Sequence, residues 1–172
     1  MACGKEMIEP IVTIEKKEDE AFLRKQTIPF DFSKFTKEEL KDLIASMRLT
    51  MKKADGVGLS ANQIGRRERF FVAQVPDTQG RPQFYAIFNP VITKMSDEMA
   101  TIEEGCLSVP HSFGQTPRAY RVTLEGFDMK GKKIKIKAWG LLARVFQHEV
   151  DHLNGKLFVD RAKTVTKITP KK

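Results

Sequence analysis

The chain has 172 residues, of which 41% are hydrophobic and 30% charged. This balance is that of a globular protein, and it excludes a wholly disordered or fibrous chain. At this length we expect a single domain over residues 1–172, with a core large enough to be stable. The longest apolar runs span only a few residues, so we expect no membrane-spanning helix and no membrane partner.

The formal net charge is +8, from 30 Lys and Arg residues against 22 Asp and Glu residues. Such an excess suits weak attraction to nucleic acid, although a solvated basic exterior is the simpler explanation. Residues 1–10 lack the apolar stretch of a secretion signal, and Glu15–Glu20 is too acidic for a transit peptide. Because Cys3 and Cys106 alone cannot build a disulfide framework, we expect a reducing compartment, the cytoplasm.

The first predicted helix covers residues 37–54. Thr36 and Glu39 have the spacing of a capping box, and apolar residues then recur at helical intervals along one face. Asp55 and Gly56 are expected to end the helix. Residues 1–24 are polar and show no clear periodicity, and residues 1–21 form an N-terminal extension.

Extended segments follow this helix. The predicted strands are 69–75, 83–88, 91–93, 120–127 and 132–138, and the last two flank the Gly-containing turn of a hairpin. A second helix is predicted over 139–153, where an apolar face leads to a stop at Asn154-Gly155. Residues 157–159 are predicted as a last short strand. This order of elements favours an α+β fold.

The strongest motif is the H-E-x-x-H sequence at His148–His152, on the second predicted helix. Residues four apart share a face of a helix, so both imidazoles can bind one metal ion. Glu149 adjoins them and can act as general base toward a water on that metal. A surface helix with two titrating histidines is the alternative, but the chain has only three histidines, so a chance match is rare.

A catalytic metal site needs three protein ligands and an open position. The candidates for the third ligand are Cys106, His111 and a carboxylate, of which Asp160 follows the helix. A thiolate at Cys106 suits a divalent metal, although a lone cysteine is more often a small buried hydrophobe. The adjacent Glu103 and Glu104 argue against apolar burial of Cys106.

A third segment, Gly56–Gly65, is rich in glycine. A phosphate-binding loop is one interpretation, but the Gly-Lys-Ser/Thr ending of such loops is missing. The other interpretation is a flat edge whose backbone approaches a ligand closely, with the amide of Gln63 as a hydrogen-bond donor.

Together these segments resemble the peptide deformylases, metal hydrolases that remove the formyl group from N-terminal formylmethionine. The family motifs G-x-G-L-x-A-x-Q, E-G-C-L-S and Q-H-E-x-D-H-L-x-G stand in order at Gly56–Gln63, Glu104–Ser108 and Gln147–Gly155. The likeness runs from about Phe22 to Arg161. It implies an α+β fold in which antiparallel or mixed sheets pack around the H-E-x-x-H helix, with an N-terminal amphipathic helix.

The resemblance implies a metal ion held by Cys106, His148 and His152. The native ion would be Fe(II), which zinc, nickel or cobalt can replace. It further implies that Glu149 takes a proton from the metal-bound water, whose hydroxide attacks the formyl carbon. Glu149 then passes the proton to the leaving amine, and formate departs.

The resemblance also implies how the substrate is held. The oxyanion would be stabilised by the metal, the side-chain amide of Gln63 and the N–H of Leu107. The substrate backbone is expected to add as a strand beside the glycine-rich segment and the cysteine motif, with its methionine in an apolar pocket partly walled by His148. The other residues expected to bind substrate are Val57, Gly58, Leu59, Gly105 and Val145.

The expected partners are N-formylmethionyl nascent peptides and, transiently, the ribosome, with no sequence-specific nucleic acid. The short basic tail, Arg161–Lys172, contains β-branched residues and Pro170, which oppose a long docking helix. Any ribosome attraction is therefore expected to be weak and electrostatic, carried partly by Lys130–Lys137.

Two other functions fit parts of this sequence. One is a zinc peptidase of the H-E-x-x-H type, which need not depend on Cys106 for its metal. The other is a catalytically silent, basic ribosome-binding protein. The presence of Gln63, Cys106, Glu149 and both motif histidines argues against lost activity.

Overall fold

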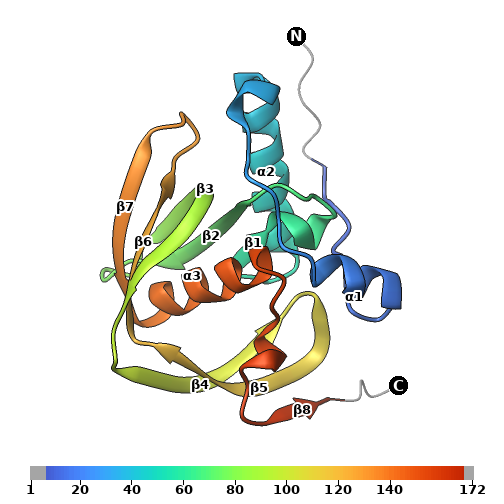
Figure 1. The fold of residues 1–172 in the computed structure, drawn as a ribbon, viewed down its shortest axis with the longest axis vertical. Helices are drawn as coiled ribbons and strands as arrows, with labels where there is room; N and C mark the ends of the chain where they lie inside the picture. Colours follow the sequence, from blue (N-terminus) through green and yellow to red (C-terminus); the bar gives the residue numbers. More distant parts are fainter. Residues whose placement is uncertain (1–6, 169–172) are drawn as a thin grey trace.

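The computed structural model describes residues 7–168, so Cys3 and Pro170 lie outside the described residues (Figure 1). Among the described residues, no helix has the length and apolar character needed to cross a membrane. The elements in chain order are α1 (Lys17–Leu23), η1 (Phe32–Lys34), α2 (Lys37–Lys53), β1 (Gly58–Ser60), η2 (Ala61–Ile64), β2 (Phe70–Pro76), β3 (Pro82–Met95), β4 (Met99–Cys106), β5 (Val109–Ala119), β6 (Arg121–Phe127), β7 (Lys133–Trp139), α3 (Gly140–Leu153), η3 (Phe158–Asp160) and β8 (Val165–Lys167), where η marks a 3₁₀ helix.

The strands form two antiparallel sheets, which confirms the predicted α+β class. The five-stranded sheet has the order β1-β2-β3-β6-β7, and the three-stranded sheet has the order β4-β5-β8. Helix α3 contacts strands of both sheets and crosses the middle of the molecule (Figure 1). The H-E-x-x-H motif is therefore central, as the resemblance implies.

Helices α2 and α3 cover opposite faces of the five-stranded sheet. Alternate residues of a strand point to opposite faces. On β2, Phe70 and Val72 pack in the cluster formed with α2, whereas Phe71 and Ala73 pack in the cluster formed with α3. The near-continuous apolar sequence of β2 follows from this burial on both sides.

The caps predicted for both long helices are present. At the start of α2, the Glu39 N–H donates to Thr36 Oγ1 at 3.2 Å, and the Thr36 N–H donates to Glu39 Oε2 at 2.7 Å. After α3, Gly155 has a φ of 72°, and a Cβ there would clash with the Arg24 carbonyl. Glycine is therefore required at this stop for both its backbone conformation and its size.

Three predictions need correction. The strand predicted at 157–159 is wrong, because Phe158–Asp160 forms the 3₁₀ helix η3, in which the Leu157 N–H donates to Asp160 Oδ2 at 2.8 Å. Residues 1–24, predicted to be aperiodic, contain the short helix α1, which buries only Leu23. The strands predicted at 83–88 and 91–93 are one strand, β3.

The hairpin of β4 and β5 has no counterpart among the predicted strands. The tail is an antiparallel strand at β8, where Phe113 pairs with Thr166. This agrees with the expectation that its β-branched residues oppose a helix.

Candidate active site

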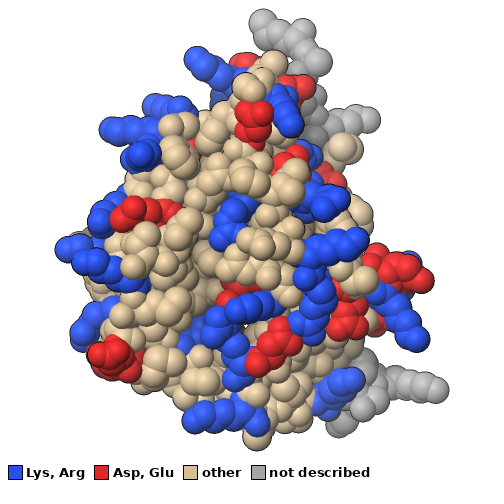
Figure 2. All heavy atoms as spheres, viewed as in Figure 1, with Lys and Arg blue, Asp and Glu red and all other residues tan. Residues whose placement is uncertain are grey.

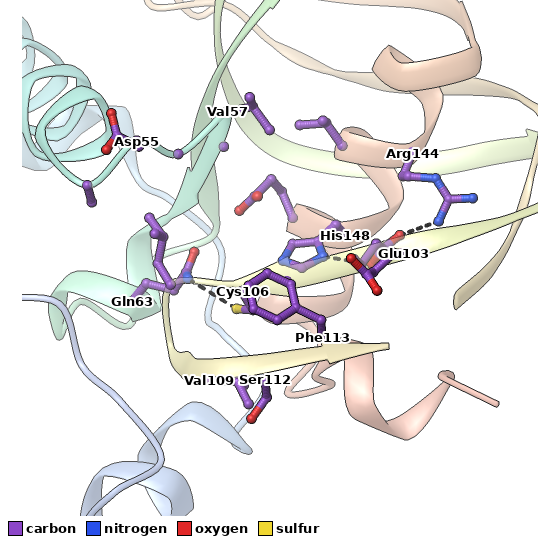
Figure 3. Close-up of a pocket in the computed structure, with 18 of the residues that line it drawn as sticks. Asp55, Val57, Gln63, Glu103, Cys106, Val109, Ser112, Phe113, Arg144 and His148 are labelled. Carbon is purple, nitrogen blue, oxygen red and sulfur yellow. Dashed lines mark hydrogen bonds and ion pairs between the residues drawn. The ribbon is translucent and has the colours of Figure 1, made fainter. Parts of the chain in front are cut away.

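The three sequence motifs meet at one end of α3. His148 and His152 lie one helical turn apart on α3, Cys106 ends β4, and Gln63 lies in η2 directly after β1. The side chains of Gln63, Cys106 and His148, from η2, β4 and α3, point toward one another (Figure 3). The fold therefore brings together residues that are far apart in the chain.

The three predicted metal ligands form a compact group. His152 Nε2 lies 3.1 Å from Cys106 Sγ and 3.2 Å from His148 Nε2, and the three ligand atoms all lie within 4.8 Å of one another. One thiol and two imidazoles suit a divalent transition metal. The donor set and its spacing therefore fit the metal that the resemblance implies.

Glu104 orients the imidazole of His148. Its Oε2 lies 3.1 Å from His148 Nδ1, so the other ring nitrogen, Nε2, faces the ligand group. Burial would raise the pKa of Glu104, but hydrogen bonds from His148 and Arg118 outweigh it and hold that pKa well below its ordinary value. Glu104 is thus a buried carboxylate that stays ionised.

Arg118 joins Glu104 to α3. Its Nε and Nη2 donate to the two Glu104 oxygens at 2.6 and 2.9 Å, and its Nη1 donates to Asp151 Oδ2 at 2.8 Å. Asp151 also accepts two hydrogen bonds from Arg161, and Arg144 donates to Glu104 and to the Thr116 carbonyl. Since Arg118 is only 2% exposed, these charges are compensated inside the protein rather than by water.

The pKa values of the two histidines are shifted in opposite directions. Burial opposes protonation of His148, but its contacts with Cys106 and Glu104 raise its pKa to about 10. Burial and the nearby charge of His148 lower the pKa of His152 well below the ordinary value.

Glu149 lies beside the ligand group, only 3% exposed. Burial raises its pKa to about 7. Its Oε2 is buried and has no hydrogen-bond partner among the described residues, and a Cβ at Gly58 would clash with its Oε1. The glycine thus makes room for a carboxylate with a free oxygen next to the cavity, as a general base requires.

Gln63 is held in one orientation. Its Oε1 accepts from the Ser60 N–H at 2.9 Å, so its Nε2 faces the site, donating to Ser108 Oγ at 3.1 Å and lying 3.7 Å from Cys106 Sγ. With Oε1 occupied, only the NH₂ end is free to meet a ligand.

A cavity of about 480 Å³ opens onto these groups. Of the residues predicted to bind substrate, all but Leu59 line it. Leu59 is instead fully buried in the core against α2, so its side chain cannot meet a ligand, although its backbone lies in the edge strand β1. The predicted substrate-binding residues that line the cavity are Val57, Gly58, Gly105 and Val145. The predicted residues Gln63, Cys106, Leu107, His148 and Glu149 line it as well.

The rival third ligands are excluded by position. His111 lines the cavity but stands outside the ligand group. Asp160 pairs with Arg24 instead. Cys106 is the third member that the structure brings to the two motif histidines.

Sequence reasoning did not identify the supporting charges at Arg118, Arg144 and Asp151. Asp151 lies inside the H-E-x-x-H motif. Its acidic side chain on the buried face of the helix was the one sequence signal that a basic partner is needed. Nothing local marks Arg118, since its partners lie 14 and 33 residues away.

A sequence profile of the family described as polypeptide deformylase matches residues 8–167. The chain belongs to the polypeptide deformylase family. It is therefore an enzyme, a hydrolase that removes the N-terminal formyl group from nascent peptides.

A "Peptide deformylase" of Halothermothrix orenii is 42% identical over 152 residues, covering 88% of this chain and 94% of the relative. "Peptide deformylase 2" of Gloeobacter violaceus is 41% identical over 134 residues, covering 77% and 71%.

Solved deformylases share the fold. A class I type b enzyme from Acinetobacter baumannii, bound to Met-Ala-Ser, has a TM-score of 0.81 and 32% identity, covering 91% of this chain and 99% of that one. The Thermotoga maritima enzyme has a TM-score of 0.78 and 37% identity, with the same coverage. The family expectation from the three motifs is thus confirmed.

The charges around Glu104 yield a testable prediction. Glu104→Gln should lower the free energy of unfolding by about 3 kcal/mol, because it leaves buried guanidinium charge uncompensated. It should also weaken metal affinity by about tenfold or more, because His148 loses its ionised partner. Thermal unfolding and metal titration measure the two effects.

The matched control is the neighbouring Glu103→Gln. Glu103 is exposed and forms no ion pair in the described part of the chain. Its replacement should change stability by less than about 0.5 kcal/mol. Equal effects at both positions would contradict the role given to Glu104.

Proposed function

We propose that Cys106, His148 and His152 hold a divalent metal ion and that Glu149 moves the proton during deformylation. The observation that supports this most is the compact ligand group beside a buried carboxylate with one free oxygen. When bound, such a metal lowers the pKa of a coordinated water and polarises the substrate carbonyl.

Glu149 then accepts a proton from the attacking water and returns it to the nitrogen of the leaving amine. The bond between the formyl carbon and this nitrogen breaks, and formate is released. A pKa of about 7 suits both halves of this cycle, since the group must gain and lose a proton near neutral pH.

We propose the Gln63 Nε2 and the Leu107 N–H as donors to the developing oxyanion. Gln63 already presents Nε2 to the site, and Leu107 directly follows Cys106 and lines the cavity. Donors fixed before the reaction stabilise the transition state without reorganisation.

We propose that the substrate backbone adds beside β1. This strand ends the five-stranded sheet, so its second edge is unpaired within the described chain. Val57, Gly58 and Gly105 border the cavity there, and Val145 with His148 form the wall for the methionine side chain. The Met-Ala-Ser bound to the Acinetobacter baumannii relative is a peptide of the matching kind.

We propose Fe(II) as the native ion and the cytoplasm as the compartment, with residues 1–172 acting as one catalytic domain. Nascent chains are made in the cytoplasm, and a Cys106 thiol stays reduced there. Zinc, nickel or cobalt would fit the same donors.

We propose a weak, electrostatic contact with the ribosome. Lys133, Lys135 and Lys137 alternate along the exposed side of β7, an edge strand of the five-stranded sheet. In Figure 2, basic side chains follow the left border of the molecule, where Figure 1 places β7. Lysines on a solvent-exposed strand attract phosphates without reading sequence.

The proton-transfer role is tested with Glu149→Gln. The variant should keep its metal, because Glu149 is no ligand, and should lose at least about a hundredfold in kcat. Metal analysis and hydrolysis of a formyl-Met peptide are measured on the same anaerobic sample. Near-normal turnover would refute the role, and Glu125→Gln serves as control, since Glu125 lies on β6 and does not line the cavity.

The iron assignment is tested by exposure to air. Iron-loaded enzyme should lose activity as Cys106 oxidises, whereas nickel-loaded enzyme should not. Mass spectrometry of the Cys106 peptide and metal analysis accompany the assay. Equal decay of both forms, with equal oxidation of Cys106, would count against iron.

Ribosome pelleting at rising ionic strength tests the proposed ribosome contact. Binding should fall steeply with salt and weaken further in the double variant Lys133→Ala, Lys137→Ala. The matched control is Lys52→Ala, Lys53→Ala at the end of α2. Binding that persists at high salt and disappears on deletion of Lys163–Lys172 would instead make the tail a specific docking element.

A further inference from the structure

The chain before α1 runs past the active site. We call residues 7–14 the N-terminal strap. It begins on α2, where the Glu9 N–H donates to Thr50 Oγ1 at 2.8 Å and Ser46 Oγ donates to the Met7 carbonyl at 2.6 Å. It ends at Ile14, which packs on the small apolar cluster around Val109 and Phe158. Both ends of the strap are therefore fixed to the body of the protein.

The second half of the strap donates two hydrogen bonds to main-chain carbonyls. The Val12 N–H donates to the Gln63 carbonyl at 2.7 Å, and the Ile14 N–H donates to the Ser108 carbonyl at 2.9 Å. The N–H of Thr13, between them, makes no backbone hydrogen bond among those of the described residues. The strap thus contacts two main-chain positions directly beside the site.

These two acceptors lie in segments that adjoin different sheets. Gln63 follows β1 of the five-stranded sheet, and Ser108 lies in the turn between β4 and β5 of the three-stranded sheet. Gln63 itself carries one proposed oxyanion donor, its Nε2. Ser108 directly follows Leu107, whose N–H is the other. The separation of the donors thus depends on how the two sheets are held together.

The direct link between the segments is a side-chain bond. Gln63 Nε2 donates to Ser108 Oγ at 3.1 Å, but this amide is also the proposed donor to substrate. Main-chain bonds from Val12 and Ile14 do not involve that amide. They can hold the two segments in register while Gln63 meets the substrate.

We infer that the N-terminal strap is a positioning element for the oxyanion donors. The N–H groups of Val12 and Ile14 fix the distance between the Gln63 amide and the Leu107 N–H. The inference rests on the proposed function of Gln63 and Leu107 as donors. It gives the extension before α1 a part in the reaction without contact with the substrate.

The test removes one N–H at a time. Val12→Pro and Ile14→Pro each delete a donor, and Thr13→Pro is the matched control, since it deletes an N–H without a backbone partner. Each of the first two should lower kcat about tenfold, with KM within about twofold and metal content unchanged, because displacing a donor weakens transition-state binding. The control should keep kcat within about twofold.

A double-mutant cycle separates positioning from general loosening. Gln63→Leu alone should lower kcat by about a hundredfold or more. Val12→Pro added to Gln63→Leu should then cost less than about twofold, because the donor it positions is already gone. If Val12→Pro costs the same tenfold in both backgrounds, the strap does not act through Gln63.

The outcomes distinguish the two layers of the proposal. Unchanged kcat in Gln63→Leu would overturn the donor role itself. Reduced kcat in Gln63→Leu with unchanged kcat in both proline variants would overturn only the strap. If a proline variant does not fold, Thr50→Val can replace it in the double-mutant cycle with Gln63→Leu. It removes the anchor of Glu9 with a side chain of equal shape, so its kcat should fall measurably in the parent and not in Gln63→Leu.

Discussion

Arg118 donates hydrogen bonds to two buried carboxylates on different elements, Glu104 on β4 and Asp151 on α3. Glu104 in turn orients His148, and Cys106 lies two residues further along the chain. One guanidinium therefore aligns the strand that carries the thiol with the helix that carries both imidazoles. Desolvating three charges is costly, and bidentate geometry with full hydrogen bonding offsets that cost. The position of the ligand group depends on this arrangement.

The parts of the fold that could be predicted are those with a local signal. Helices α2 and α3 have apolar faces and end signals in their own sequence, and β2, β6 and β7 have apolar or alternating patterns. The β4–β5 hairpin was missed because its buried face is polar or small, at Ser112, Gly114, Thr116 and Arg118. Hydrophobic periodicity cannot detect a strand whose interior side carries hydroxyls and a guanidinium.

The candidate site divides in the same way. Residues that belong to contiguous motifs, such as Glu149 and Gln63, could be named from the sequence, and the family resemblance selected Cys106 from among the rival ligands. What could not be named was the support: Arg118 and Arg144 act through partners distant in sequence. Leu59 shows the converse limit, since its place in a motif did not reveal that its side chain points into the core.

The order in which the chain is synthesised gives the strap a further consequence. Ile14 leaves the ribosome early, yet its acceptor at Ser108 follows roughly 90 residues later, and His152 later still. At a synthesis rate of about 5–20 residues per second, the strap remains without its hydrogen-bond acceptor at Ser108 for some seconds. It must dock across two sheets that are themselves assembled around α3. A growing copy of this enzyme therefore completes its active site late, because the strap can bind both Gln63 and Ser108 only after Ser108 has been made, and the ligand group needs His152.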